Sequence, residues 1–179
     1  MTVIHTKLIC CTLVLLFLYA GFILPQSAAA DHLSAPEHYI TMEFDLQNNS
    51  FQANSRINLP PGTSLHLDLS HLSVSRIIIN GQPATSGPDN DTLDIQPSAK
   101  EQEILLTYSK TITPGTSPYD IISETGITLI DNWYPVANQE MFFKLTAYIP
   151  ENFEAVSEAD EIITFQVENR NQVNIVSGK

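Results

Sequence analysis

The sequence predicts an all-β domain built as an antiparallel β-sandwich. Three observations support this prediction. Apolar and polar residues alternate over several short segments, which is the pattern of strands with one buried face. Turn-forming sequences separate these segments at intervals of about 8–12 residues. Outside residues 1–30, no segment keeps the 3.6-residue periodicity of an amphipathic helix.

The first two predicted strands form a hairpin. In residues 40–46, apolar side chains occupy alternate positions from Ile40 onward, with polar side chains between them. Residues 51–59 repeat this alternation, beginning at Phe51. The intervening sequence QNNS, at 47–50, is typical of a turn because asparagine tolerates a positive φ.

Further strands follow along the chain. Residues 74–79 end in Asn80-Gly81, the strongest short hairpin signal, and the three isoleucines at 77–79 predict a central position in the sheet. Residues 142–149 alternate until Pro150, which has no N–H to donate to a ladder. The remaining predicted strands cover 65–69, 92–95, 104–108, 127–130, 155–157 and 162–167, while 111–118 predicts a loop and 168–179 shows only a weak alternation.

The beginning of the chain has the features of an export signal. Lys7 supplies a positive charge, residues 8–24 are an apolar run, and the three alanines at 28–30 form a cleavage signal before Asp31. We expect residues 1–30 to be a cleaved signal peptide or N-terminal signal helix, and 31–179 to be a periplasmic or secreted domain. The alternative is an uncleaved membrane anchor, since the apolar run is at the short limit for a spanning helix.

Composition restricts the partners of the domain. Both cysteines, Cys10 and Cys11, lie in the expected signal segment, so no disulfide is predicted after it. The formal net charge is −12 at pH 7, and the chain without Lys7 is more acidic still. Phosphate binding requires a basic surface, so nucleic acid is excluded as a partner, and a membrane is expected only if the N-terminal segment stays uncleaved.

A segment near the end of the chain, residues 126–160, resembles a known family. It contains Trp133-Tyr134-Pro135, a Phe-x-Leu-Thr strand at 143–146, a proline turn and the sequence FEAVS at 153–157. In this it resembles the end of the N-terminal β-domain of M1-type zinc aminopeptidases (gluzincins) and their bacterial relatives. The resemblance implies a β-sandwich that packs against a catalytic domain, which would follow residue 179.

The catalytic motifs of that family are absent from the sequence. Its zinc site uses H-E-x-x-H, in which two histidines four residues apart share one helix face and the glutamate activates water. No two of the five histidines have this spacing, and the exopeptidase motif G-x-M-E-N is missing. We therefore expect the chain to have no catalytic residue and to be no enzyme by itself, unless a separate catalytic domain supplies activity. The five histidines are His5, His32, His38, His66 and His71.

Two segments contain several histidine or aspartate residues that could bind a metal ion, but neither has the pattern of a metal site. Residues 66–71 carry His66, Asp68 and His71, a pattern more typical of the solvated face of a strand. Residues 89–94 carry three aspartates without the glycine and the bidentate glutamate that a calcium loop requires. We predict no metal and no cofactor.

Four apolar or aromatic residues are candidates for an interface. The surface that would pack on the catalytic domain of the family would here expose Trp133, Tyr134, Val136 and Met141. The competing interpretation is that Trp133 fills one end of the core. The five acidic residues within 151–161 are either a solvated rim or a docking site for a basic partner.

Three functional hypotheses remain. The first is an exported, non-catalytic scaffold or interaction module, with a protein or a separate catalytic domain as its partner. The second is the N-terminal fragment of a split or truncated M1-type zinc aminopeptidase. The third is an unrelated periplasmic binding domain.

Overall fold

The computed structural model describes residues 35–84, 91–113, 115, 119–130 and 132–178. The regular secondary structure of these residues consists of β-strands alone, which confirms the all-β prediction. This part of the chain has no helix suited to crossing a membrane. The expected signal segment, residues 1–30, lies outside the described residues, so its role and its cleavage stay predictions.

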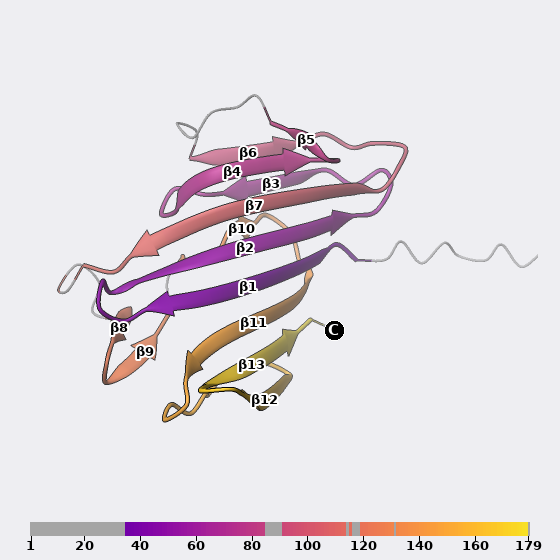
Figure 1. Cartoon of the computed structure of the whole chain (residues 1–179). Coiled ribbons are helices and arrows are strands. Elements are labelled where there is room, and N and C mark those ends of the chain that lie inside the picture. Colours follow the sequence, from indigo (N-terminus) through magenta and orange to yellow (C-terminus); the bar gives the residue numbers. More distant parts are fainter. Residues whose placement is uncertain (1–34, 85–90, 114, 116–118, 131, 179) are drawn as a thin grey trace, which may run out of the picture. The chain divides into compact units, whose positions relative to one another are not determined.

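A large mixed sheet forms one layer of the domain (Figure 1). It has eight strands, and its order places strands from the beginning and the end of the chain side by side. In spatial order, the strands are β12 (Glu161–Val167), β13 (Arg170–Ser177), β11 (Phe142–Pro150), β1 (Glu37–Asp45), β2 (Ser50–Leu59), β7 (Gln102–Thr111), β4 (Ser73–Ile79) and β5 (Gln82–Pro83).

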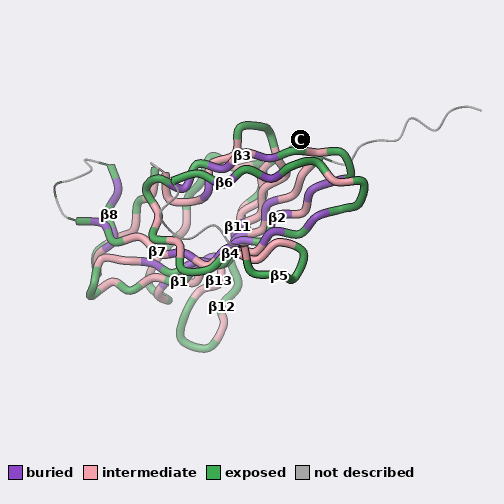
Figure 2. Tube along the Cα trace, turned by 90° about the horizontal axis from the view of Figure 1, so that it is seen from above, coloured by how far each residue is buried: buried purple, intermediate pink, exposed green. Residues whose placement is uncertain are grey.

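A small sheet forms the second layer. Viewed from above, β3 and β6 lie over the main sheet, and buried residues line the space between the layers (Figure 2). The small sheet has the order β10 (Val136–Ala137), β3 (Leu65–Asp68) and β6 (Thr92–Ile95), and a separate ribbon joins β8 (Ile121–Ser123) to β9 (Gly126–Thr128). The predicted β-sandwich is thereby confirmed.

Both predicted hairpins form. Strands β1 and β2 pair antiparallel across a turn in which Asn49 has a φ of 49°. Strands β4 and β5 pair antiparallel across Asn80 and Gly81, whose φ values of 52° and 76° are those of a type I′ turn. Positive φ at both central residues explains why asparagine and glycine are suited to this turn.

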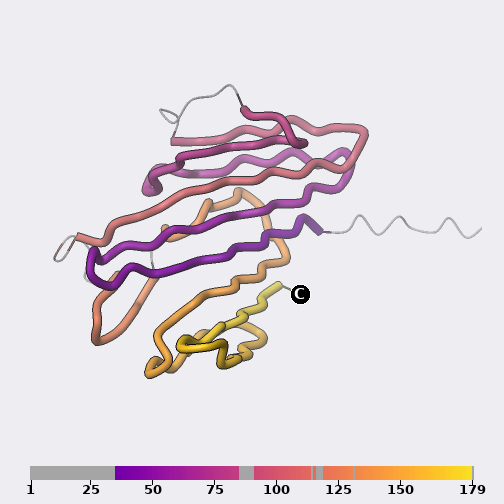
Figure 3. Tube along the Cα trace, viewed as in Figure 1, coloured from indigo at the N-terminus to yellow at the C-terminus, as the bar shows by residue number. Residues whose placement is uncertain are grey.

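One strand pair departs from the expected antiparallel arrangement. Strands β1 and β11 run parallel, with Glu37 opposite Phe142 and Glu43 opposite Tyr148. The other strand pairs among the described residues are antiparallel. Parallel neighbours need a crossover connection, and here the chain between them carries the whole second layer (Figure 3).

Three sequence predictions about strands are wrong. Residues 170–177, where the sequence shows only a weak alternation and no strand was predicted, form β13, which pairs with β11 on one side and β12 on the other. Residues 155–157, expected to be a strand, pair with nothing in a ladder. The isoleucines of β4 are not central, because only the two-residue β5 lies beyond this strand in the sheet.

The core lies between the two layers and uses the inward side of each alternating strand. Ile40 and Met42 of β1, Phe51 of β2 and Leu106 of β7 are at most 2% exposed. Leu67 of the small sheet belongs to the same cluster of buried side chains. Each fully buried side chain of this size contributes about 1.5–3 kcal/mol to the free energy of folding.

The inner position of β13 leads to a stability prediction. Val173 is 1% exposed, so Val173→Ala should lower the free energy of unfolding by about 2 kcal/mol, measured by urea denaturation. Val156, at 93% exposed, provides the matched control, and Val156→Ala should change stability by less than about 0.5 kcal/mol. Equal, small effects of the two substitutions would show that β13 is not an interior strand.

Candidate functional site

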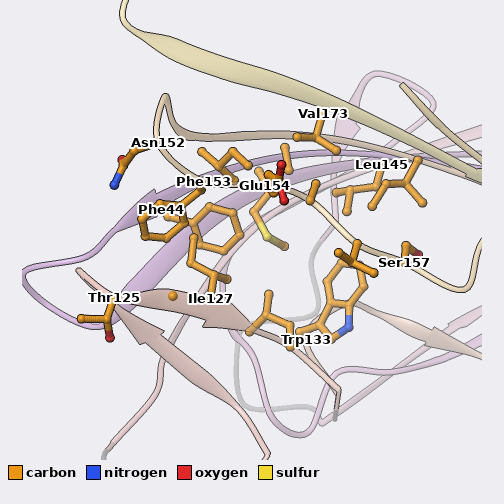
Figure 4. A pocket seen from close by; sticks show the side chains of 18 of the residues that line it. Phe44, Thr125, Ile127, Trp133, Leu145, Asn152, Phe153, Glu154, Ser157 and Val173 are labelled. Carbon is orange, nitrogen blue, oxygen red and sulfur yellow. The ribbon is translucent and has the colours of Figure 1, made fainter. Parts of the chain in front are cut away.

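An apolar groove of about 630 Å³ opens on the inner face of the main sheet. None of its lining residues belongs to the small sheet. Phe44, Leu145 and Val173 form part of the sheet side of the groove, and Ile127 and Trp133 face them (Figure 4). The remaining sheet residues that line the groove are Met42, Ala147, Ile149 and Ile175.

The segment after β11, residues 152–157, forms one wall of the groove. Its backbone is held by a side chain of β13, because the Asn171 amide donates to the carbonyl oxygens of Glu151 at 3.0 Å and Phe153 at 3.2 Å. The Phe153 N–H donates to the Pro150 carbonyl at 3.0 Å, which closes a turn. These bonds fix the beginning of the segment, at residues 151–153.

The opposite wall, formed by residues 126–130, 132 and 133, is held by Lys110 at the end of β7. Its Nζ lies 3.7 Å from Oδ2 of Asp120 and donates to the Asn132 carbonyl at 3.2 Å. The Oδ1 atom of Asp120 accepts the N–H of Ile130 at 2.7 Å. Because Asp120 is 4% exposed, this ion pair is shielded from water, and loss of one partner would leave a buried charge.

A second, smaller cavity of about 280 Å³ contains the residues predicted as an interface. Trp133, Tyr134, Val136 and Met141 all line it, together with Phe143. The rings pack closely: centroids lie 4.7 Å apart for Trp133 and Tyr134, and 5.3 Å apart for Tyr134 and Phe143. Trp133 lines both cavities and is half-buried, so it is neither a fully buried plug nor an isolated surface anchor. The role of these residues as an interface stays a prediction.

The floor of the aromatic cavity holds a buried histidine that the sequence analysis missed. His38 is 0% exposed, and its Nε2 lies 2.6 Å from the Ser55 hydroxyl. Its Nδ1 has no hydrogen-bond partner among the described residues. Burial lowers the pKa of His38 to about 3, so the ring is neutral at physiological pH. The alternation of β1 could have predicted this burial, because His38 lies two residues before Ile40 and therefore on the same inward face of the strand.

A second buried polar group lies on β7. Tyr108 is 1% exposed and packs edge-on against Phe51 at a centroid distance of 6.2 Å. Its hydroxyl has no hydrogen-bond partner within the described part of the chain. Burial, and secondarily the nearby Tyr134, raises the pKa of this hydroxyl. A permanently neutral phenol contributes volume to the core and no charge.

Two acidic residues line the groove. Glu124 and Glu154 are the charged residues in its lining, and both are exposed. The acidic residues Glu151, Glu158, Asp160 and Glu161 in the same stretch as Glu154 are exposed as well. The groove thus combines an apolar sheet side with two exposed acidic side chains.

The two segments weighed as metal sites are partly brought together. Nδ1 of His66 on β3 lies 2.7 Å from Oδ1 of Asp94 on β6, across the small sheet. Asp89 lies outside the described residues. Within the described ranges, no three or more His, Cys, Asp or Glu side chains are grouped so that they could hold a metal ion.

Comparison with solved structures identifies known proteins with a similar fold. No protein-family model matches the sequence, and no curated protein matches it. The structure is similar to that of the M1 zinc metallopeptidase from Deinococcus radiodurans, with a TM-score of 0.54 and 12% identity, over 81% of this chain and 39% of that one. The fold is that of part of an M1 zinc metallopeptidase. This confirms, at the level of fold, the resemblance that residues 126–160 indicated.

Two further structures support the same similarity. A variant of the Deinococcus radiodurans enzyme bound to a Tyr-Ser-Ala substrate has a TM-score of 0.52 and 13% identity, over 80% of this chain and 38% of that one. A two-domain M1 zinc metallopeptidase variant bound to L-tryptophan has a TM-score of 0.53 and 12% identity, over 80% and 39%. The chain therefore matches well under half of the length of these enzymes, and the similarity concerns the fold alone.

Burial of His38 predicts that acid destabilises the domain. The folded state holds the pKa at about 3, below the ordinary 6.5, so the unfolded state binds a proton first as the pH falls. The stabilising contribution is complete above about pH 6.5 and is lost progressively toward about pH 3, with a total on the order of several kcal/mol.

This prediction is measured by urea unfolding at pH 7 and pH 4.5. His38→Gln should lower stability at pH 7, because it removes the bond to Ser55, and should reduce the loss of stability between the two pH values. His71→Gln, at an exposed histidine, is the control and should leave the pH dependence unchanged. If His38→Gln and the wild type lost equal stability on acidification, His38 would not be the buried neutral group described above.

Proposed function

We propose that the protein is a non-catalytic interaction module, related in fold to the β-domain of M1 metallopeptidases, whose groove binds an apolar segment of a partner protein. The observation that carries this proposal is the groove of about 630 Å³ lined by large apolar side chains of three neighbouring strands. Apolar surface that a domain leaves accessible in a concave site is characteristic of binding sites. The aromatic cavity at Trp133, Tyr134, Val136 and Met141 extends this surface.

The charges at the groove define the chemistry of the partner. Glu124 and Glu154 line it and are exposed, and the chain as a whole has a formal net charge of −12. Complementary charge steers association and rejects partners of like charge. The partner segment therefore carries large apolar side chains flanked by lysine or arginine.

The cellular setting of the proposal rests on the sequence. The basic residue Lys7, the apolar run 8–24 and the alanines at 28–30 support export to the periplasm or the exterior, with an uncleaved membrane anchor as the alternative. The lack of H-E-x-x-H and G-x-M-E-N supports a role without peptidase activity of the chain itself.

A second candidate function is favoured by the comparison of folds. The similarity covers 80% of this chain but 38% of an M1 zinc metallopeptidase. The protein would then be the β-domain part of an M1-type aminopeptidase, and the partner segment would belong to a separate catalytic domain. Both candidates use the same surface, and they differ in the identity of the partner.

Binding in the groove is tested with two synthetic peptides, one alternating lysine and leucine and one alternating glutamate and leucine. Trp133 is the single tryptophan of the chain and lines the groove, so its fluorescence reports occupancy directly. The basic peptide should shift this fluorescence in a saturable titration, and the acidic peptide should not. Glu154→Lys should weaken binding of the basic peptide about tenfold, or ~1.4 kcal/mol.

Glu103→Lys provides the matched control, since it makes the same charge change at an exposed position of β7 that does not line the groove. This variant should bind the basic peptide nearly as tightly as the wild type. Equal weakening by Glu103→Lys and Glu154→Lys would indicate attraction by net charge alone. Failure of both peptides to change the fluorescence would reject the groove as the binding site.

Peptidase activity of the chain itself is tested on aminoacyl-anilide substrates. Because the sequence lacks the paired histidines of a zinc site, we expect no stoichiometric zinc by metal analysis and no release of the anilide amine. Hydrolysis that a chelator abolishes, in a preparation free of host peptidases, would contradict the non-catalytic proposal. A preparation from cells without the expression plasmid serves as the control.

A further inference from the structure

One end of the main sheet has an open edge. Among the described residues, strand β12 is the last strand of the sheet and pairs with β13 alone (Figure 1). No backbone hydrogen bond between described residues connects β12 to any other segment. Its outer N–H and C=O groups therefore form a template on which another strand can pair.

The open edge carries exposed apolar side chains. Ile163 and Phe165 are 40% and 51% exposed, and Figure 2 shows most of β12 as exposed. The register places these two residues opposite Asn174 and Gln172 of β13, so they stand on the outer face of the sheet beside polar neighbours. An isoleucine and a phenylalanine at the border of a polar face have no core to join in the isolated domain.

The edge also lacks the features that normally prevent strand pairing. Such features are lysine, proline, bulges and very short strands. In β12 the sequence EIITFQV has no lysine and no proline, and its single charge is Glu161 at the first position. The opposite end of the sheet contrasts with this, because β5 has two residues and one of them is Pro83.

We propose that two copies of the chain associate through β12, antiparallel about a two-fold axis, so that their main sheets become one continuous sheet. The register with Thr164 opposite its own counterpart places Ile163 of one copy opposite Phe165 of the other. The same register places Glu161 opposite Val167, so no like charges within the strand face each other. Aliphatic–aromatic pairs across antiparallel strands stabilise a sheet, and here each copy supplies both members.

A second copy is the occupant that the residues of β12 favour. An isologous interface requires a surface that is complementary to itself, and the sequence from Glu161 to Val167 satisfies this about Thr164. Each copy supplies an apolar residue at both positions that flank the axis. The interface is separate from the groove, because no β12 residue lines the groove.

The association is tested by sedimentation of the full chain over a range of concentrations. The wild type should show a monomer–dimer equilibrium, and Phe165→Lys should raise the dissociation constant at least about tenfold, because two lysines would then stand beside the two-fold axis. Ile121→Lys is the matched control, since Ile121 on β8 is 50% exposed, and it should leave the equilibrium unchanged. A circular dichroism spectrum identifies any variant that fails to fold.

Crosslinking tests the register and does not depend on the lysine variant. In a chain with Cys10→Ser and Cys11→Ser, Thr164→Cys places two thiols at the axis, where opposite Cβ atoms lie about 4.5–5.5 Å apart. A short thiol-specific reagent should join this variant into dimers, and Val156→Cys, on the exposed segment after β11, should not be joined.

Three results would overturn the proposal. The first is a wild type that stays monomeric at its highest soluble concentration, and the second is association that Phe165→Lys leaves unchanged. The third is equal crosslinking of the Thr164→Cys and Val156→Cys variants, which would indicate random collision. Pairing with a strand of a different protein would give the first result. Peptide binding in the groove is measured separately, so each proposal can fail without the other.

Discussion

The parallel pairing of β1 with β11 is the constraint on which the rest of the domain depends. It joins a strand from the beginning of the domain to one near its end, with Ile40 opposite Leu145. Two parallel neighbours cannot be connected by a tight turn, so the chain between them must leave the sheet and return. That excursion contains the small sheet, the β8–β9 ribbon and Trp133. Strand β11 in turn provides the edge on which β13 and then β12 pair, so the floor of the groove exists only because this ladder forms.

The same topology explains why the groove is partly open. On the side of β11 and β13, the inner face is covered by strand β9 and by irregular segments instead of by the small sheet. These segments are held by individual side chains, Lys110 for one wall and Asn171 for the other. A single hydrogen bond contributes about 1 kcal/mol, far less than a continuous strand ladder. Each wall is therefore tied to the main sheet at a few points, whereas the strands of the sheet are held by continuous ladders.

The sequence predicted the elements whose alternation is long and regular, such as β1, β2 and β11. It did not predict β13, because Asn171 and Asn174 interrupt the pattern and asparagine is depleted in strands. Pairing on both sides stabilises β13 despite this composition, and no local pattern reports such pairing. Trp133, Tyr134, Val136 and Met141 line one cavity, and the sequence could group them because they are close along the chain. The sequence did not predict the groove, because its lining comes from five separate segments of the chain. It did not predict a buried His38 either, because the predicted strand began at Ile40, although His38 lies two residues earlier on the same inward face of β1.

The short edge strand β5 determines what kind of assembly the domain can form. Strand β5 has two residues, which among the described residues pair only with Ile78 and Ile79 of β4, and Pro83 has no N–H to donate to a further strand. A sheet that can accept a neighbour at both ends grows without limit and yields fibres, whereas one with a single receptive end is complete after one addition. In the pair proposed above, the shortness of β5 and its proline would reduce further strand pairing at the far end of each sheet.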